Sequence, residues 1–136
     1  MVWPPTRWFV GFCDQDIPAP WKWFTRPGFV HVWATTYIAD RDVWLFLEWS
    51  SYRLFIELVD GDTVDALFAI SKKSGTLIET RSVEEPVKLT RPTMPTYCVS
   101  LLKQLLGLRG VIVTPYQLFC AIKRDGGRVI FQQKET

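Results

Sequence analysis

The pattern of apolar residues constrains the fold most, because it changes character about two-thirds of the way along the chain. Before that point, short runs rich in β-branched and aromatic residues are separated by turn residues, which indicates antiparallel strands. We expect strands at residues 7–13, 29–38, 43–49, 52–59, 76–81 and 128–132. Residues 63–71 fit either a strand or a short helix, after a hairpin signal at residues 60–62.

Two helices are predicted in the C-terminal third. Residues 97–106 carry apolar side chains at helical spacing, and Thr96 suits the N-cap. A second helix starts at Thr114 and Pro115, with Thr as N-cap and Pro at the first helical position, and ends before Asp125. The expected fold is α+β: an antiparallel meander of five to six strands with the two C-terminal helices packed on one face.

Length and composition predict a single domain spanning residues 1–136, because a chain this long with 48% hydrophobic residues can bury a core. Prolines and apolar patterning divide it into four parts. These are a Trp- and Pro-rich arm and loop (1–28), antiparallel strands (29–83), a proline-containing linker (84–95), and a helical part with the last strand (96–136).

Charge and targeting signals exclude several classes of protein. The formal net charge of +2 is too small to indicate a nucleic-acid or membrane partner. Binding of single-stranded nucleic acid through Trp stacking is disfavoured for the same reason, because such binding grooves need a row of basic residues. The N-terminus lacks the layout of a secretory signal, and no apolar run approaches bilayer length. A cytoplasmic location, or a place in an assembly made in a cytosol, is therefore expected.

Cysteine usage predicts neither a disulfide framework nor a zinc site. The three cysteines are an odd number, and none has metal-type spacing. Cys13 and Cys120 lie in apolar runs and are interpreted as small buried hydrophobes. No metal or other cofactor is expected.

Any cysteine–histidine chemistry in this chain must use His31, because it is the one histidine. Cys98 falls in the first turn of a predicted helix, where unpaired N–H groups and the helix dipole favour a thiolate and can stabilise an oxyanion. Strand alternation groups His31 with Phe29, Trp33 and Thr35. A helix packed on that face would bring Cys98 within reach of the imidazole.

A third polar group is needed to orient the ring, and Glu48 on the neighbouring strand is the first candidate. Asp42 and Glu57 are possible substitutes. Candidate substrate-binding residues are Trp33, Trp23 and Tyr97. Each feature also has a purely structural explanation. His31 could be a hydrogen-bonded core residue, Cys98 could simply pack in the core, and Glu48 could face solvent. The aromatic side chains could belong to the core.

Two segments resemble a known superfamily. Residues 28–33 and 97–107 are similar to circularly permuted papain-like proteins of the NlpC type, in which a strand His precedes a helix-start Cys. That group includes the lecithin–retinol acyltransferase-like enzymes. Residues 114–118 also resemble small proteins of bacterial viruses and their hosts. The resemblance implies Cys98 as nucleophile, His31 as base and Glu48 as orienting residue.

The resemblance implies a cysteine-dependent amide or ester hydrolase or an acyltransferase. Cys98 would attack an acyl carbonyl, His31 would protonate the leaving group, and peptide substrates, including cell-wall peptides, are candidates. The alternative that the resemblance implies is a catalytically silent papain-like structural or adaptor subunit of a phage particle. Such a subunit would be virion-associated and would have phage or cell-envelope proteins as partners. An open Cys98 beside His31 favours the enzyme, whereas a Cys98 that faces away favours the adaptor.

Overall fold

The architecture is that of a six-stranded antiparallel sheet with helices on both faces. A computed structural model describes residues 7–14, 29, 31–50, 53–81, 98–108, 110–112 and 114–132. The elements are β1 (Arg7–Cys13), β2 (His31–Ile38), η1 (Ala39–Arg41), β3 (Val43–Ser50), β4 (Arg53–Val59), α2 (Gly61–Ser74), β5 (Gly75–Arg81), α3 (Cys98–Leu105), α4 (Pro115–Arg124) and β6 (Arg128–Phe131). The predicted α+β class is confirmed. The single-domain boundaries stay a prediction.

The strand order in the sheet is β4-β3-β2-β1-β5-β6, and every neighbouring pair is antiparallel. The first four strands form the predicted meander. The chain then returns through α2, so that β5 pairs with β1 rather than with β4. The expectation of a continuous meander is therefore wrong beyond β4. Residues 63–71, which fitted either a strand or a short helix, belong to a helix of 14 residues that connects β4 to β5.

The helix α2 begins where the sequence signals a hairpin turn. The side chain of Asp60 accepts a hydrogen bond from the backbone N–H of Thr63 at 2.8 Å, so Asp60 is an N-cap rather than a turn residue. The side chains of Val64, Phe68 and Ser71 recur at helical spacing, and Val64 and Ser71 are buried. Aspartate serves both hairpin turns and helix N-caps, which explains why the hairpin prediction failed.

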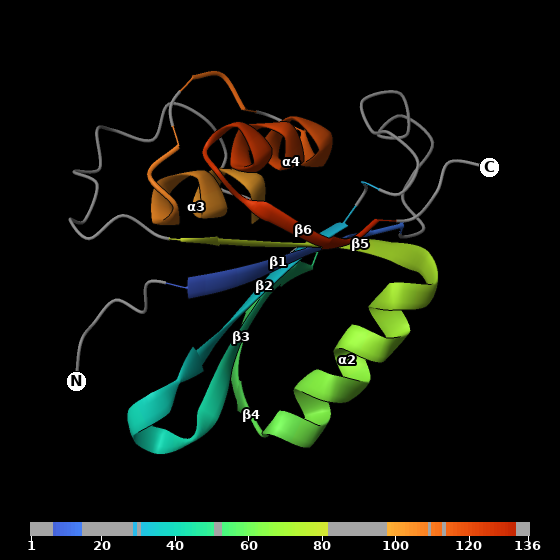
Figure 1. The fold of residues 1–136 in the computed structure, drawn as a ribbon. Helices are drawn as coiled ribbons and strands as arrows, with labels where there is room; N and C mark the ends of the chain where they lie inside the picture. Colours follow the sequence, from blue (N-terminus) through green and yellow to red (C-terminus); the bar gives the residue numbers. More distant parts are fainter. Residues whose placement is uncertain are drawn as a thin grey trace.

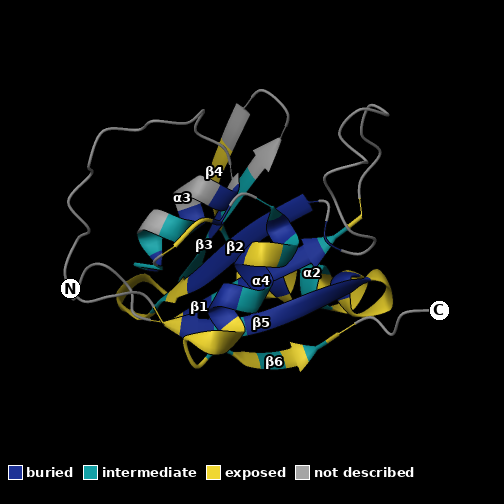
Figure 2. Ribbon diagram, turned by 90° about the horizontal axis from the view of Figure 1, so that it is seen from above, coloured by how far each residue is buried: buried dark blue, intermediate teal, exposed yellow. Residues whose placement is uncertain are grey.

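The larger core lies between the sheet and the two C-terminal helices, as predicted, and Figure 2 shows the buried strands beneath them. Its members include strand residues Val10, Phe12, Val32, Ala34 and Ile78, and helix residues Val99, Leu102, Leu118 and Ile122. The predicted start of α4 is confirmed by a capping box, in which Thr114 and Gln117 each accept from the other's backbone N–H.

A smaller core lies between the sheet and α2, on the opposite face. Trp33, Phe46 and Leu77 are buried there, and Phe68 of α2 packs against them. The indole of Trp33 lies over Gly11, where an added Cβ would come within 2.0 Å of Trp33 Cε2. A glycine at this position is therefore what allows the tryptophan to lie flat on the sheet.

Several predicted segments lie outside the described residues. They include the linker at 84–95, the N-cap Thr96, and residues 1–6 and 15–28 of the arm and loop. Within the described part of the chain, no helix has the length and apolar character needed to cross a membrane.

Candidate functional site

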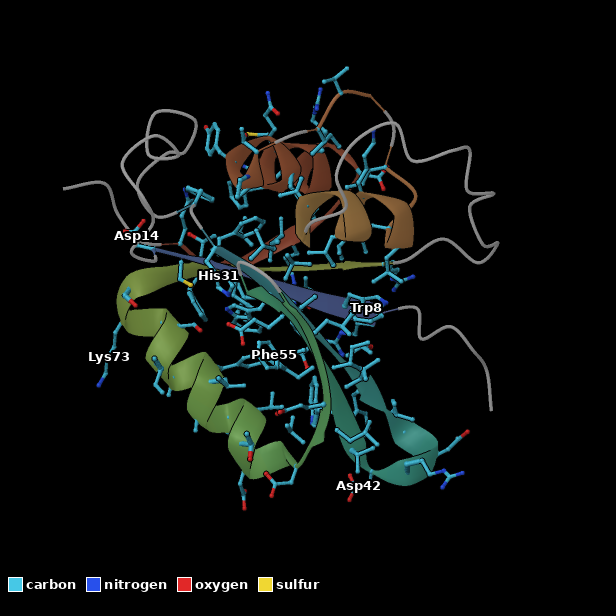
Figure 3. All side chains as sticks on the ribbon, turned by 180° about the vertical axis from the view of Figure 1, so that it is seen from behind. Trp8, Asp14, His31, Asp42, Phe55 and Lys73 are labelled. Atoms are coloured by element: carbon cyan, nitrogen blue, oxygen red, sulfur yellow. The ribbon has the colours of Figure 1, made fainter. Side chains whose placement is uncertain are left out.

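The imidazole of His31 points to the face of the sheet that α2 covers. His31 (labelled in Figure 3) is the first residue of β2, and its Cα pairs with that of Cys13 on β1. The next residue, Val32, belongs to the core under α3 and α4. Because successive strand residues point to opposite faces, His31 lies on the other side. The ring is buried.

A carboxylate from the neighbouring strand holds the ring in place. His31 Nε2 and Glu48 Oε1 are 2.7 Å apart, and the side chains are 8% and 37% exposed respectively. When Glu48 is ionised it can only accept, so Nε2 carries the proton and donates it. The second ring nitrogen, Nδ1, then has a free lone pair and is the atom that could take up a proton. Glu48 thus has the contact expected of an orienting residue.

The thiol closest to His31 in the sheet register is that of Cys13, which is half-buried. Burial, together with the nearby negative charges of Glu48 and Asp14, raises the pKa of this thiol to about 11. A thiol with this pKa is protonated at neutral pH, so Cys13 is not an activated nucleophile. No residue pattern indicates this neighbour, because the register of β1 against β2 cannot be read from the sequence.

The helix that begins at Cys98 lies on the other face of the sheet. The Cys98 side chain itself lies outside the described residues. The following residues Val99 and Leu102 are buried in the same core as Val32. The sheet therefore lies between α3 and the His31 imidazole, and Figure 1 shows α3 and α2 on opposite sides of it. The expectation that this helix packs on the face of His31 is wrong.

The strand alternation is also interrupted between Phe29 and His31. Phe29 forms an isolated bridge, and its ring contacts Phe12 and Phe119 at centroid distances of 5.4 and 5.0 Å. These contacts place Phe29 in the α3–α4 core, opposite to His31. The predicted grouping of Phe29 with His31 and Trp33 is therefore wrong, because the regular strand begins at His31 rather than at Phe29.

Three other predicted site residues, Trp33, Asp42 and Glu57, lie in the described part of the structure. Trp33 is buried in the α2 core and stacks on Phe68, so it does not wall an open groove. Trp23 and Tyr97 lie outside the described residues. Of the two substitutes for Glu48, Asp42 accepts a hydrogen bond from the Tyr37 hydroxyl at the opposite end of β2.

Glu57, the second substitute, is exposed on β4, two strands away from β2. Glu48 is therefore the candidate carboxylate that contacts His31 in the described part of the structure. Within the same residues, no three His, Cys, Asp or Glu side chains gather in a way that could hold a metal ion.

Comparison with known proteins gives no family for this chain. No family model matches it, and no curated protein or solved structure matches it either. The papain-like resemblance therefore rests on the short segments of the sequence alone. What the structure defines is an α+β protein in which a buried histidine is hydrogen-bonded to a partly exposed glutamate on one face of the sheet.

Proposed function

We propose that this chain is a catalytically silent structural or adaptor domain that binds an extended segment of another polypeptide along β4. The observation that carries this proposal is the apolar character of β4, which forms one edge of the sheet. Phe55, Ile56 and Leu58 on this strand are 41%, 59% and 65% exposed. Exposed apolar side chains in a row on an edge strand are typical of a surface that pairs with another strand.

The geometry of the edge supports this mode of binding. In the described structure β4 pairs on one side with β3, and no described strand pairs with its other side. The strand has seven residues and contains neither proline nor lysine, which commonly protect edges from pairing. Because Ile56 and Leu58 alternate with Phe55, an added strand would find apolar side chains on both faces.

The proposal is tested with a library of random linear peptides, selected on the purified chain at about 1 μM or less. We expect selected peptides to alternate apolar and polar residues, and binding to slow amide hydrogen exchange in β4. Ile56→Lys should abolish binding. Ile130→Lys, the matched substitution at an exposed isoleucine of the opposite edge strand β6, should not. Failure to select peptides, or binding unaffected by Ile56→Lys, overturns the proposal.

Cysteine-dependent hydrolysis or acyl transfer through Cys98 is the second candidate function. The hydrogen-bonded pair of His31 and Glu48 favours it, because such a pair orients and polarises a general base. The position of α3 across the sheet opposes it, because a base must lie within hydrogen-bonding distance of the thiol that it deprotonates. The first candidate is therefore preferred, and the papain-like ancestry of either stays a hypothesis.

A further inference from the structure

We infer that the strand bound by β4 is the β4 strand of a second copy of this chain, paired antiparallel about a twofold axis at Phe55. This inference rests on the proposed function and names its partner. Pairing of this kind would join two six-stranded sheets edge to edge. The interface would be isologous, so that each contact occurs twice.

The charges of β4 are complementary to those of its own antiparallel copy. The strand reads Arg-Leu-Phe-Ile-Glu-Leu-Val from Arg53 to Val59. When Phe55 lies opposite Phe55 of the second copy, the register places position 53 of each chain opposite position 57 of the other. This register aligns residues of opposite charge at two places, position 53 (Arg) of each chain with position 57 (Glu) of the other. Shifting either chain by two residues removes both pairs, so charge selects this register.

The apolar positions agree with the same register. Phe55 would meet its own copy on the α2 side of the sheet, where an aromatic pair is favourable. On the other side, position 54 of each chain would lie opposite Ile56, which is 59% exposed in the single chain. Pairing therefore removes apolar side chains from water on both faces while it satisfies the outward backbone groups of β4.

The opposite edge is a poorer candidate for self-pairing. The strand β6 has four residues, against seven in β4, and its register with β5 is interrupted by an irregularity between Leu77 and Ile78. Its Arg128 is already bound to Glu79 of β5, with Nη2 and Oε2 2.7 Å apart. A short, irregular edge strand resists strand addition, and a charged side chain that is already in an ion pair is not available to a second chain.

Sedimentation velocity of the full chain over about 1 μM to about 1 mM tests the inference, with two charge reversals as its central comparison. In a homodimer of the Glu57→Arg variant, positions 53 and 57 that face each other both carry a positive charge. In a homodimer of the Arg53→Glu variant, both carry a negative charge. We expect each variant alone to dimerise at least about tenfold more weakly than the unmodified chain. An equimolar mixture of the two variants regains both attractive pairs and should form a heterodimer.

The outcomes separate this inference from the proposed function. Pairing of β4 in this register is overturned if the unmodified chain stays monomeric over the whole range. It is also overturned if the mixture of variants dimerises no more tightly than either variant alone. If that chain still binds peptides at β4, the proposed function stands with a different partner. Ile130→Lys on β6 is the control and should dimerise like the unmodified chain. Circular dichroism of both reversals checks that they fold.

Discussion

His31 and Glu48 form a hydrogen bond of 2.7 Å between adjacent strands, on the face of the sheet that α2 covers. The ring is almost fully buried, and the carboxylate is partly open to water. Such a pair satisfies a buried polar ring whether or not it takes part in chemistry. Because the pair lies on the face opposite α3, its position favours the structural or adaptor function over cysteine-dependent catalysis.

Removing the Glu48 carboxylate should destabilise the fold, because the buried ring loses its hydrogen-bond partner. We expect Glu48→Ala to lower the free energy of unfolding by about 1–3 kcal/mol, and Glu48→Gln to cost less because an acceptor oxygen is kept. Urea denaturation measures both. Glu57→Ala, on an exposed carboxylate of β4, is the control and is studied at concentrations too low for chain association. Equal losses in the two alanine variants would show that the pair does not stabilise the fold.

Replacing Gly11 should disrupt the α2 core, because the new methyl group would overlap the indole of Trp33. We expect Gly11→Ala to lower the free energy of unfolding by about 1–3 kcal/mol or more. Gly61→Ala is the matched control, because an added Cβ there meets its nearest neighbour, Trp44 Nε1, only at 4.0 Å. Thermal unfolding of both variants distinguishes them, and a Gly11→Ala protein as stable as the parent would contradict the packing described for Trp33.

Acid should weaken the fold in part through Glu79. The guanidinium groups of Arg7 and Arg128, each 2.7 Å from a Glu79 oxygen, lower the pKa of this carboxyl. A lowered pKa in the folded state adds stability that is fully present above the unfolded-state pKa, ordinarily about 4.3, and is lost as pH falls through the folded value.

Glu79→Gln should therefore reduce the loss of stability between about pH 5 and about pH 3. The reduction should be at most about 1 kcal/mol for each ion pair, because both arginines are largely exposed. Urea denaturation at a series of pH values measures this slope. An unchanged slope in the variant would mean that the two arginines do not hold the carboxylate ionised.

Cys13 should react slowly with thiol reagents at neutral pH. With a pKa of about 11, about one thiol in a thousand is ionised at pH 8. Alkylation by iodoacetamide, followed by mass spectrometry, should accelerate only as pH approaches that value. Glu48→Gln removes a negative charge that raises the pKa, so it should speed the reaction. Rapid modification of Cys13 at pH 7 in the folded protein would contradict the assignment.

Much of the fold follows from the sequence, because local patterns determine the elements. The β-branched and aromatic runs predicted the strands to within a few residues, and Thr114 with Pro115 located the start of α4. The helix at Gly61–Ser74 was only one of two predicted alternatives, because its apolar pattern fits both a strand and a helix. Its N-cap Asp60 also suits a turn. Its position between β4 and β5 then changed the topology.

The candidate site was harder to predict, because it depends on which face each side chain occupies. Glu48 beside His31 was expected from the neighbouring strands, and the structure gives them a hydrogen bond. The face on which α3 packs depends on tertiary packing, which no local pattern reveals, and the position of Phe29 on the face opposite His31 is equally invisible in the sequence. Cys13 beside His31 depends on the register across a loop, and register is a long-range property.

The measurement that tests this account most directly compares alkylation of Cys98 in the unmodified chain and in His31→Ala, over about pH 5 to about pH 9. Because the sheet lies between α3 and the imidazole, we predict that the Cys98 rate at each pH changes by less than about twofold. Cys120, on α4, serves as the internal control for unfolding. A drop of about tenfold or more at Cys98 alone would contradict the account and restore the cysteine–histidine pair as a catalytic site.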